Sequence, residues 1–245
     1  TIIKVLADRF GRSESERLMT LYRDGFITQR DFDLIKDFGF NLVRLPFDSR
    51  MLIDEAGSLR PNAFKLLDRG LAMAEKAGIY VILDMHGGPG SQSTMDHTGK
   101  RDLNKLWSNP RLQDQMVELW RTISKRYKDR SVVAAYDILN EPYGDYRTDM
   151  RPALRTLIPS CYRAIRSTGD NTVVIFPNAL GAGITFYGDL RSRGFKQIAF
   201  TDHYYPGLFG SPSTLQSHAG VFARTMPEAQ QYLEQNNAAM LIGEF

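Results

Sequence analysis

Short, continuous apolar runs alternate with longer amphipathic stretches along the 245-residue chain. The apolar runs are rich in Val and Ile, which predicts strands buried on both faces of a parallel sheet. The stretches between them carry apolar residues at helical spacing, for example Leu67, Leu71 and Ala74. Six strands are therefore expected, at residues 40–47, 79–86, 132–140, 172–178, 197–205 and 238–245.

Polar and glycine residues mark the ends of the expected helices. Thr28 and Asp31 have the spacing of a capping box, which predicts a helix that begins there and runs to about Phe38. Four glycines lie between a helical pattern and the next strand, where a left-handed residue is favoured: Gly39, Gly78, Gly169 and Gly194.

The repeated strand–helix alternation indicates βαβ units. No Pro/Ser-rich linker divides the chain, so residues 1–245 are expected to form a single catalytic domain. An open sheet that binds a dinucleotide would need G-x-G-x-x-G after its first strand, and "GGPG" (87–90) does not match that pattern. The pattern thus favours the closed (β/α)8 TIM barrel.

Composition excludes several partners. A hydrophobic fraction of 42% and a charged fraction of 24% are typical of a globular protein, and the net charge of +3 is not that of a nucleic-acid binder. No apolar run is long enough to span a membrane, and the opening "TIIKVLADRF" lacks the features of a signal peptide. The single cysteine, Cys161, excludes an internal disulfide and a cysteine-rich metal site.

Each expected strand carries a hydrogen-bonding or titratable group that we assign to its carboxyl end. In a barrel these ends converge on one mouth, where active sites lie. Since a buried carboxylate costs several kcal/mol unless it is paired, Glu141 is expected to have a chemical role. The groups are Arg44, Asp84, His86, Asn140, Glu141, Asn178, His203, Tyr205 and Glu244.

Two further histidines and three aromatic residues are not assigned to the site. His97 and His218 fall in expected loops and are predicted to be structural. Trp107, Tyr143 and Phe209 are either rim aromatics that stack on sugars or packing residues, and the sequence does not decide between these roles.

Five motifs in order resemble glycoside hydrolase family 5, the large cellulase-containing family: "GFNLVRLPF", "YVILDMHGGPGSQS", "YDILNEP", "DHYYP" and "LIGEF". The resemblance extends from about Phe10 to Phe245 and implies a (β/α)8 barrel with catalytic glutamates after strands four and seven. It implies that Glu141 is the acid/base and Glu244 the nucleophile. Residues implied to bind substrate or orient the nucleophile are Arg44, His86, Asn140, His203 and Tyr205.

Two carboxylates suit glycoside hydrolysis with retention, in which one attacks the anomeric carbon and the other protonates the leaving oxygen. Arg44 near Glu244 would keep the nucleophile ionised, and a less charged setting would raise the pKa of Glu141. We expect a monomer that acts on an oligo- or polysaccharide, a β-1,4- or β-1,3-linked β-glucan, without metal, cofactor, nucleic acid or membrane. "FITQRDF" and "HGGPGSQS" favour the exo-β-1,3-glucanase branch.

Other functions remain open at this point. A β-mannanase of the same family and a non-catalytic sugar-binding barrel both fit the motifs. "HGGPG" also resembles the oxyanion loop of serine α/β-hydrolases, but no G-x-S-x-G follows it. The scattered histidines disfavour a metal-dependent hydrolase.

In this family the acid/base follows strand four, which makes residues 132–140 strand four. Residues 79–86 are then strand three, residues 40–47 strand two and residues 238–245 strand seven. We therefore expect a barrel that lacks its first and eighth strands, truncated at both ends, and poorly soluble and nearly inactive in isolation because its sheet edges are exposed. The substrate class suggests a secreted or periplasmic enzyme, but the sequence leaves the compartment open.

Overall fold

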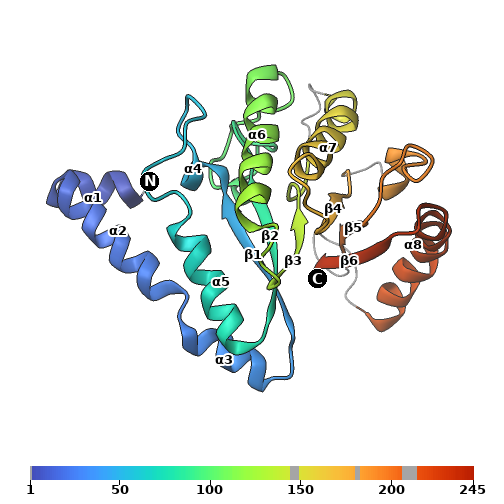
Figure 1. Cartoon of the computed structure of the whole chain (residues 1–245), viewed down its shortest axis with the longest axis horizontal. Coiled ribbons are helices and arrows are strands. Elements are labelled where there is room, and N and C mark those ends of the chain that lie inside the picture. The colour runs from blue at the N-terminus through green and yellow to red at the C-terminus, as the bar shows by residue number, and fades with distance from the viewer. Residues whose placement is uncertain (1, 144–148, 180–182, 206–213) are drawn as a thin grey trace. The chain divides into compact units, whose positions relative to one another are not determined.

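The computed structural model describes residues 2–143, 149–179, 183–205 and 214–245. From β1 onward, strands and helices alternate along the described chain (Figure 1). The strands are β1 (Leu42–Asp48), β2 (Tyr80–Gly87), β3 (Val133–Asp137), β4 (Val173–Pro177), β5 (Ile198–His203) and β6 (Ala239–Glu244). The helices are α1 (Ile2–Phe10), α2 (Arg12–Phe26), α3 (Gln29–Asp37), α4 (Ser49–Leu52), α5 (Lys65–Ala77), α6 (Pro110–Tyr127), α7 (Arg151–Arg166) and α8 (Leu215–Asn236), with 3-10 helices η1 (Asp96–Thr98) and η2 (Ile184–Tyr187).

The chain divides into two compact units, of which the first comprises Thr1–Val43 and Phe64–Tyr80. In this unit α1 packs against α2, and α3 packs against α5. The predicted capping box is present: the Asp31 side chain accepts a hydrogen bond from the Thr28 backbone N–H at 2.7 Å. Helix α5 ends at Gly78, whose left-handed conformation (φ 67°) is accessible to glycine at little cost.

The second unit comprises Arg44–Ala63 and Val81–Phe245 and contains most of the sheet. The strand order is β1-β2-β3-β4-β5-β6, and β2 to β6 pair in parallel with their neighbours in the chain. All six predicted strands are confirmed. Residues 2–41 contain no strand, in agreement with the sequence-based expectation. The single-domain expectation stays a prediction.

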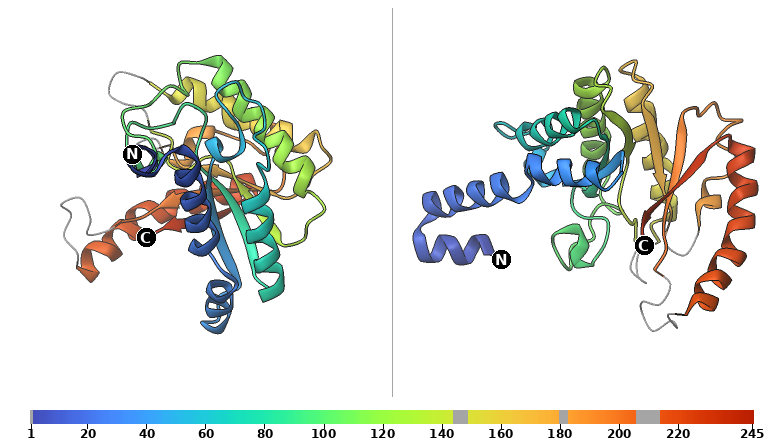
Figure 2. Two further views of the ribbon diagram at one scale, coloured as in Figure 1. Left: turned by 90° about the vertical axis from the view of Figure 1, so that its left-hand side faces the viewer. Right: turned by 90° about the horizontal axis from the view of Figure 1, so that it is seen from below.

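Alternation along the strands separates two faces of the sheet. On one face, Ile82, Ala135, Ile175 and Ala199 form a buried cluster. The residues next to these in each strand point to the other face of the sheet. There they pack against α6, α7 and α8, which run beside the strands in Figures 1 and 2. The ring pairs between helices and strands are Trp120–Tyr136 at 5.6 Å, Tyr162–Phe176 at 6.2 Å and Tyr232–Phe200 at 5.3 Å.

The same alternation positions the polar groups. Asp84 and Asp137 come two residues after Ile82 and Ala135, so they share the face of the buried cluster, nearer the carboxyl ends of their strands. The sheet therefore changes along this face from an apolar layer to a layer of carboxylates.

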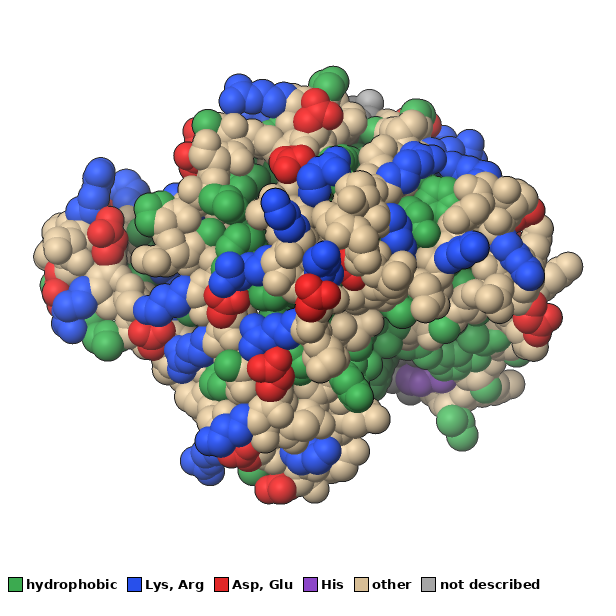
Figure 3. Space-filling model, in the orientation of Figure 1, with side chains coloured by type: hydrophobic (Ala, Val, Ile, Leu, Met, Phe, Trp, Pro, Cys, Tyr) green, Lys and Arg blue, Asp and Glu red, His purple; other side chains and the backbone are tan. Residues whose placement is uncertain are grey.

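Surface charges are mixed on the face shown in Figure 3, where Lys and Arg side chains are interspersed with Asp and Glu. Among the described helices, none has both the length and the apolar content that crossing a bilayer requires.

Candidate active site

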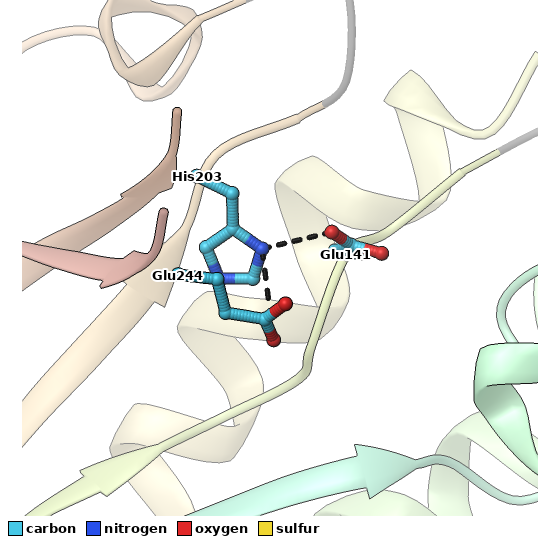
Figure 4. Close-up of side chains that lie close together, drawn as sticks. All are labelled: Glu141, His203 and Glu244. Carbon is cyan, nitrogen blue, oxygen red and sulfur yellow. Dashed lines mark hydrogen bonds and ion pairs between the residues drawn. The ribbon is translucent and has the colours of Figure 1, made fainter. Parts of the chain in front are cut away.

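The carboxylates of Glu141 and Glu244 both lie near the same ring nitrogen of His203 (Figure 4). The Nδ1 atom of His203 lies 2.8 Å from Oε1 of Glu141 and 3.8 Å from Oε1 of Glu244. One carboxylate oxygen of Glu141 and one of Glu244 lie within 4.8 Å of each other. Glu141 follows β3, whereas His203 and Glu244 end the neighbouring strands β5 and β6. The fold thus brings together two carboxylates that are far apart in the sequence.

Both oxygens of Glu244 accept hydrogen bonds. Nη1 of Arg44 lies 3.0 Å from Oε1, and the Tyr205 hydroxyl donates to Oε2. Burial and the contact with Glu244 raise the pKa of Tyr205, so its hydroxyl remains a donor. These contacts are of the kind that the family resemblance implies for Arg44 and Tyr205.

The glycine before Glu244 allows β6 to approach β5 closely. A Cβ at Gly243 would lie 2.6 Å from Oγ1 of Thr201 and 2.8 Å from Nε2 of His203. Because these distances are shorter than van der Waals contact, only glycine leaves room for His203 in its observed position between the glutamates.

Arg44 is the centre of a buried polar network. Its Nε lies 2.9 Å from Oδ2 of Asp137, and its Nη2 lies 2.7 Å from Oδ1 of Asn140 and 3.2 Å from Oδ1 of Asp84. Burial opposes the positive charge, but the surrounding carboxylates outweigh burial and raise the pKa of Arg44. The guanidinium therefore connects Glu244 to two aspartates beneath it.

Asp84 and Asp137 form a pair of fully buried carboxylates on adjacent strands, at directly paired positions. Within the described residues, Oδ1 of each accepts no hydrogen bond. Burial and the charge of Asp84 raise the pKa of Asp137 to about 7, against the opposing effect of Arg44. Burial and the neighbouring charge therefore favour the protonated form of Asp137.

His86 and Asn140 complete this layer. Nδ1 of His86 lies 2.8 Å from Oδ2 of Asp84, and its Nε2 lies 3.4 Å from Nδ2 of Asn140. Burial lowers the pKa of His86, but the hydrogen bond to Asp84 and the charges of Asp84 and Glu244 together outweigh burial, so the net pKa is raised. His86 therefore faces the site with its Nε2 edge while Asp84 fixes its ring.

Glu141 differs from expectation in its ionisation. The hydrogen bond from His203 lowers the pKa of Glu141, and partial burial, which acts in the opposite direction, does not offset it. The expectation of a raised pKa in a less charged setting is therefore wrong for this state of the protein, because two histidines lie beside the carboxylate. The second is His97, whose Nδ1 lies 3.5 Å from Oε2 of Glu141.

The family model "Cellulase (glycosyl hydrolase family 5)" matches residues 9–245. The chain belongs to glycosyl hydrolase family 5. The family match contains all the residues of the site described above, and the resemblance of the five motifs is confirmed.

Curated relatives carry several activities in their names. The chain is 29% identical over 250 residues to a β-xylosidase of Phanerodontia chrysosporium, which covers 98% of this chain and 51% of that protein. It is 33% identical over 141 residues to a probable glucan 1,3-β-glucosidase A of Neosartorya fischeri, covering 56% of this chain and 33% of that protein. It is 32% identical over 145 residues to endoglucanase C of Acetivibrio thermocellus, covering 58% of this chain and 40% of that protein. The chain thus spans about half the length of these relatives or less.

Solved structures share the fold. An endo-β-1,4-glucanase of Xanthomonas axonopodis pv. citri superposes with a TM-score of 0.61 at 23% identity, covering 87% of this chain and 68% of that one. An endogalactoceramidase superposes with a TM-score of 0.69 at 19% identity, covering 87% and 57%. The predicted (β/α)8 barrel class is confirmed, with six of its parallel strands in the described residues.

The structure brings all seven predicted site residues into one cluster, with one correction of placement. Arg44 is the third residue of β1 and not at its carboxyl end. Its long side chain still reaches the site, because strand side chains lean along the strand. The cluster comprises Arg44, His86, Asn140, Glu141, His203, Tyr205 and Glu244.

The two remaining histidines and the three candidate rim aromatics lie in different surroundings. His97 lies in the short helix η1, and its contact with Glu141 places it beside the site; its structural role stays a prediction. His218 lies inside α8, so its predicted place in a loop is wrong. Trp107 is buried, and its Nε1 donates to the Gln92 carbonyl at 2.9 Å, which makes it a packing residue and not a rim aromatic. Tyr143 is exposed, while Phe209 lies outside the described residues.

Asp137 is a further residue of the site that the sequence-based prediction does not include, because it lies within the apolar strand that precedes the Asn-Glu-Pro motif. Its charge inside that run, two positions after Ala135 on the buried face, was the available signal. As for metals, Glu141, His203 and Glu244 are the group of described residues whose donor atoms lie close enough to hold an ion. Two of these donors, the Glu141 carboxylate and His203 Nδ1, already bind each other.

Proposed function

We propose that this protein is a retaining glycoside hydrolase that cleaves β-glucans by a double displacement with Glu244 as nucleophile and Glu141 as acid/base. The observation that carries the proposal is the separation of the two carboxylates. Retaining enzymes hold them about 5–5.5 Å apart, and inverting enzymes about 6.5–9.5 Å apart. One oxygen of Glu141 and one of Glu244 lie within 4.8 Å of each other, which fits the first class better than the second.

The surrounding contacts suit these two roles. Arg44 and Tyr205 donate to Glu244 and aim it, so the carboxylate is ready to attack an anomeric carbon. Glu141 is half-buried and lies beside His97 and His203, which can exchange hydrogen bonds with it; this suits a residue that gives and later takes a proton. Asn140, held by Arg44, lies beside Glu141 where a sugar hydroxyl would bind.

Variants of the two glutamates test the mechanism. Glu244→Ala should abolish turnover, and added azide should restore it with the α-glycosyl azide as product. Glu141→Ala should slow substrates with poor leaving groups by about 10²–10⁴-fold and aryl glycosides with good leaving groups far less, since only the former need a proton donor. Equal losses on both substrates would show that Glu141 is structural. A chelator should not change the rate, because the proposed reaction uses no metal.

The linkage is a separate question. Names of relatives include a glucan 1,3-β-glucosidase, an endoglucanase and a β-xylosidase, so a panel should contain β-1,3- and β-1,4-glucans, xylan and mannan. Reducing ends and product sizes distinguish endo from exo action. Activity on mannan alone would favour the β-mannanase, and binding without reducing ends would favour a sugar-binding barrel.

The serine α/β-hydrolase alternative is disfavoured by the loop after β2. A serine hydrolase would need the backbone N–H of Gly88 to stabilise an oxyanion. This N–H donates instead to Oε1 of Gln92 at 3.0 Å. A donor that is already engaged inside the protein is not available to a tetrahedral intermediate.

A further inference from the structure

The side-chain amide of Gln92 is fully buried and hydrogen-bonded at both ends. Its Nε2 donates to the carbonyl oxygens of His86 at 2.9 Å and Asn140 at 2.8 Å, and its Oε1 accepts from the Gly88 N–H at 3.0 Å. Both N–H donors of the amide are used. Gln92 therefore joins the end of β2 to the backbone that follows β3.

The main chain of Gln92 makes a second pair of contacts with the same region. Its carbonyl oxygen accepts from the Tyr143 N–H at 3.2 Å and from Nε1 of Trp107 at 2.9 Å. Gln92 thus binds the chain on both sides of Glu141, at the peptide that precedes it and two residues beyond it.

Glu141 needs such support because its backbone is strained. Its φ is +37°, in the left-handed region that non-glycine residues rarely adopt, and it precedes Pro142, which favours extended conformations in the residue before it. Local preference therefore works against the observed conformation, and a contact from elsewhere in the fold has to hold it. The Asn140 carbonyl belongs to the peptide unit whose rotation sets this φ.

We propose that Gln92 is a positioning residue for Glu141: its amide holds the Asn140–Glu141 peptide in the strained conformation that aims the Glu141 carboxyl at Glu244. This inference rests on the proposed function, in which Glu141 is the acid/base. An acid that protonates a glycosidic oxygen must lie within hydrogen-bond reach of it, and a displacement of about 1 Å can cost about 10²-fold in rate.

The test compares Gln92→Met with Gln113→Met in the intact enzyme. Methionine keeps the length of the side chain and removes both donors. Gln113 is a matched control, because its Nε2 also donates to two backbone carbonyls, those of Leu106 at 3.0 Å and Trp107 at 3.2 Å, whereas within the described residues no hydrogen bond joins its side chain to residues 140–143. For each variant, kcat/KM is measured on a β-gluco-oligosaccharide and on a 2,4-dinitrophenyl β-glycoside, together with the unfolding temperature.

Gln92→Met should lower kcat/KM for the oligosaccharide about 10²-fold and leave that for the dinitrophenyl glycoside nearly unchanged, since a good leaving group needs no acid. Gln113→Met should leave the ratio of the two values as in the wild type, even where its unfolding temperature falls. Equal losses of Gln92→Met on both substrates would overturn the proposal.

A conservative variant covers the case in which Gln92→Met does not fold. In Gln92→Glu, burial keeps the new carboxyl group protonated, so it donates one of the two hydrogen bonds that glutamine donates. The ratio of the two kcat/KM values should therefore lie between those of the wild type and Gln92→Met. Failure of both Gln92 variants to fold, with Gln113→Met folded, would show that Gln92 is structural and would contradict the proposal. If the intact wild-type enzyme cleaves neither substrate, that result refutes the proposed function, and it does so without reference to any Gln92 variant.

Discussion

Replacing Asp137 by Asn should stabilise the protein increasingly as the pH rises. Asp137 is fully buried on β3 opposite Asp84 on β2, and burial together with the charge of Asp84 raises its pKa to about 7. Between about pH 4 and pH 7 the folded protein therefore holds a proton that the unfolded chain has released. The free energy of unfolding falls over this range as the pH rises, because the folded state binds more protons than the unfolded state.

The size of the effect follows from that pKa. Each pH unit costs about 1.4 kcal/mol of stability well below the pKa and less as the pH approaches it, so the wild type should lose about 3 kcal/mol through this group between pH 5 and pH 8. Asparagine resembles the protonated aspartate and cannot ionise. The stability of Asp137→Asn relative to the wild type should therefore grow by about 3 kcal/mol over the same range.

The assay is urea unfolding followed by circular dichroism at pH 5, 6, 7 and 8. Asp170→Asn is the matched control, because this buried carboxylate accepts hydrogen bonds from Ser124, Tyr136 and the Thr172 N–H and should be destabilised by the change at every pH. Above pH 7 the activity of Asp137→Asn should fall although stability rises, since Arg44 then lacks the charged partner that it has in the wild type. A stability difference that stays constant or shrinks from pH 5 to pH 8 would refute the reasoning.

Three further predictions concern the same site. His203→Ala should raise the pKa of Glu141, so the alkaline limb of the kcat/KM–pH profile should move to higher pH, and an unshifted limb would contradict the assigned cause. Asp84→Asn should lower the pKa of His86 in an NMR titration of its ring, because burial then acts without the opposing charge of Asp84. A pKa that stays raised would show that another group sustains it. Gly243→Ala should cost about 1–3 kcal/mol of stability and reduce activity, because the added methyl would lie 2.8 Å from Nε2 of His203, and a fully active, equally stable variant would rule out the close approach.

Much of the fold could be predicted from local pattern alone. The six strands, the capping box at Thr28 and the glycine ends of helices all depend on residues within a few positions of one another, so periodicity and turn chemistry are sufficient. Glu141 and Glu244 could be nominated because each stands in a short motif at a strand end. Their placement as a pair followed from the general rule that parallel strands present their carboxyl ends together.

The chemical state of the site depended on contacts between distant segments. The pKa of Glu141 is lowered by His203, 62 positions along the chain, and His97 reaches the same carboxylate from η1. Nothing in the local sequence of either residue carries that information, because a pKa depends on which groups lie within a few ångströms in space.

Asp137 and Gln92 illustrate the same limit. In the sequence, one is a charge inside an apolar run and the other an amide in a loop. The tertiary structure makes Asp137 a partner of Asp84 and Arg44, and joins Gln92 to the backbone of the candidate acid/base. Periodicity determines which side of a strand a residue faces, but only the packed fold determines which side chains and carbonyls it meets there.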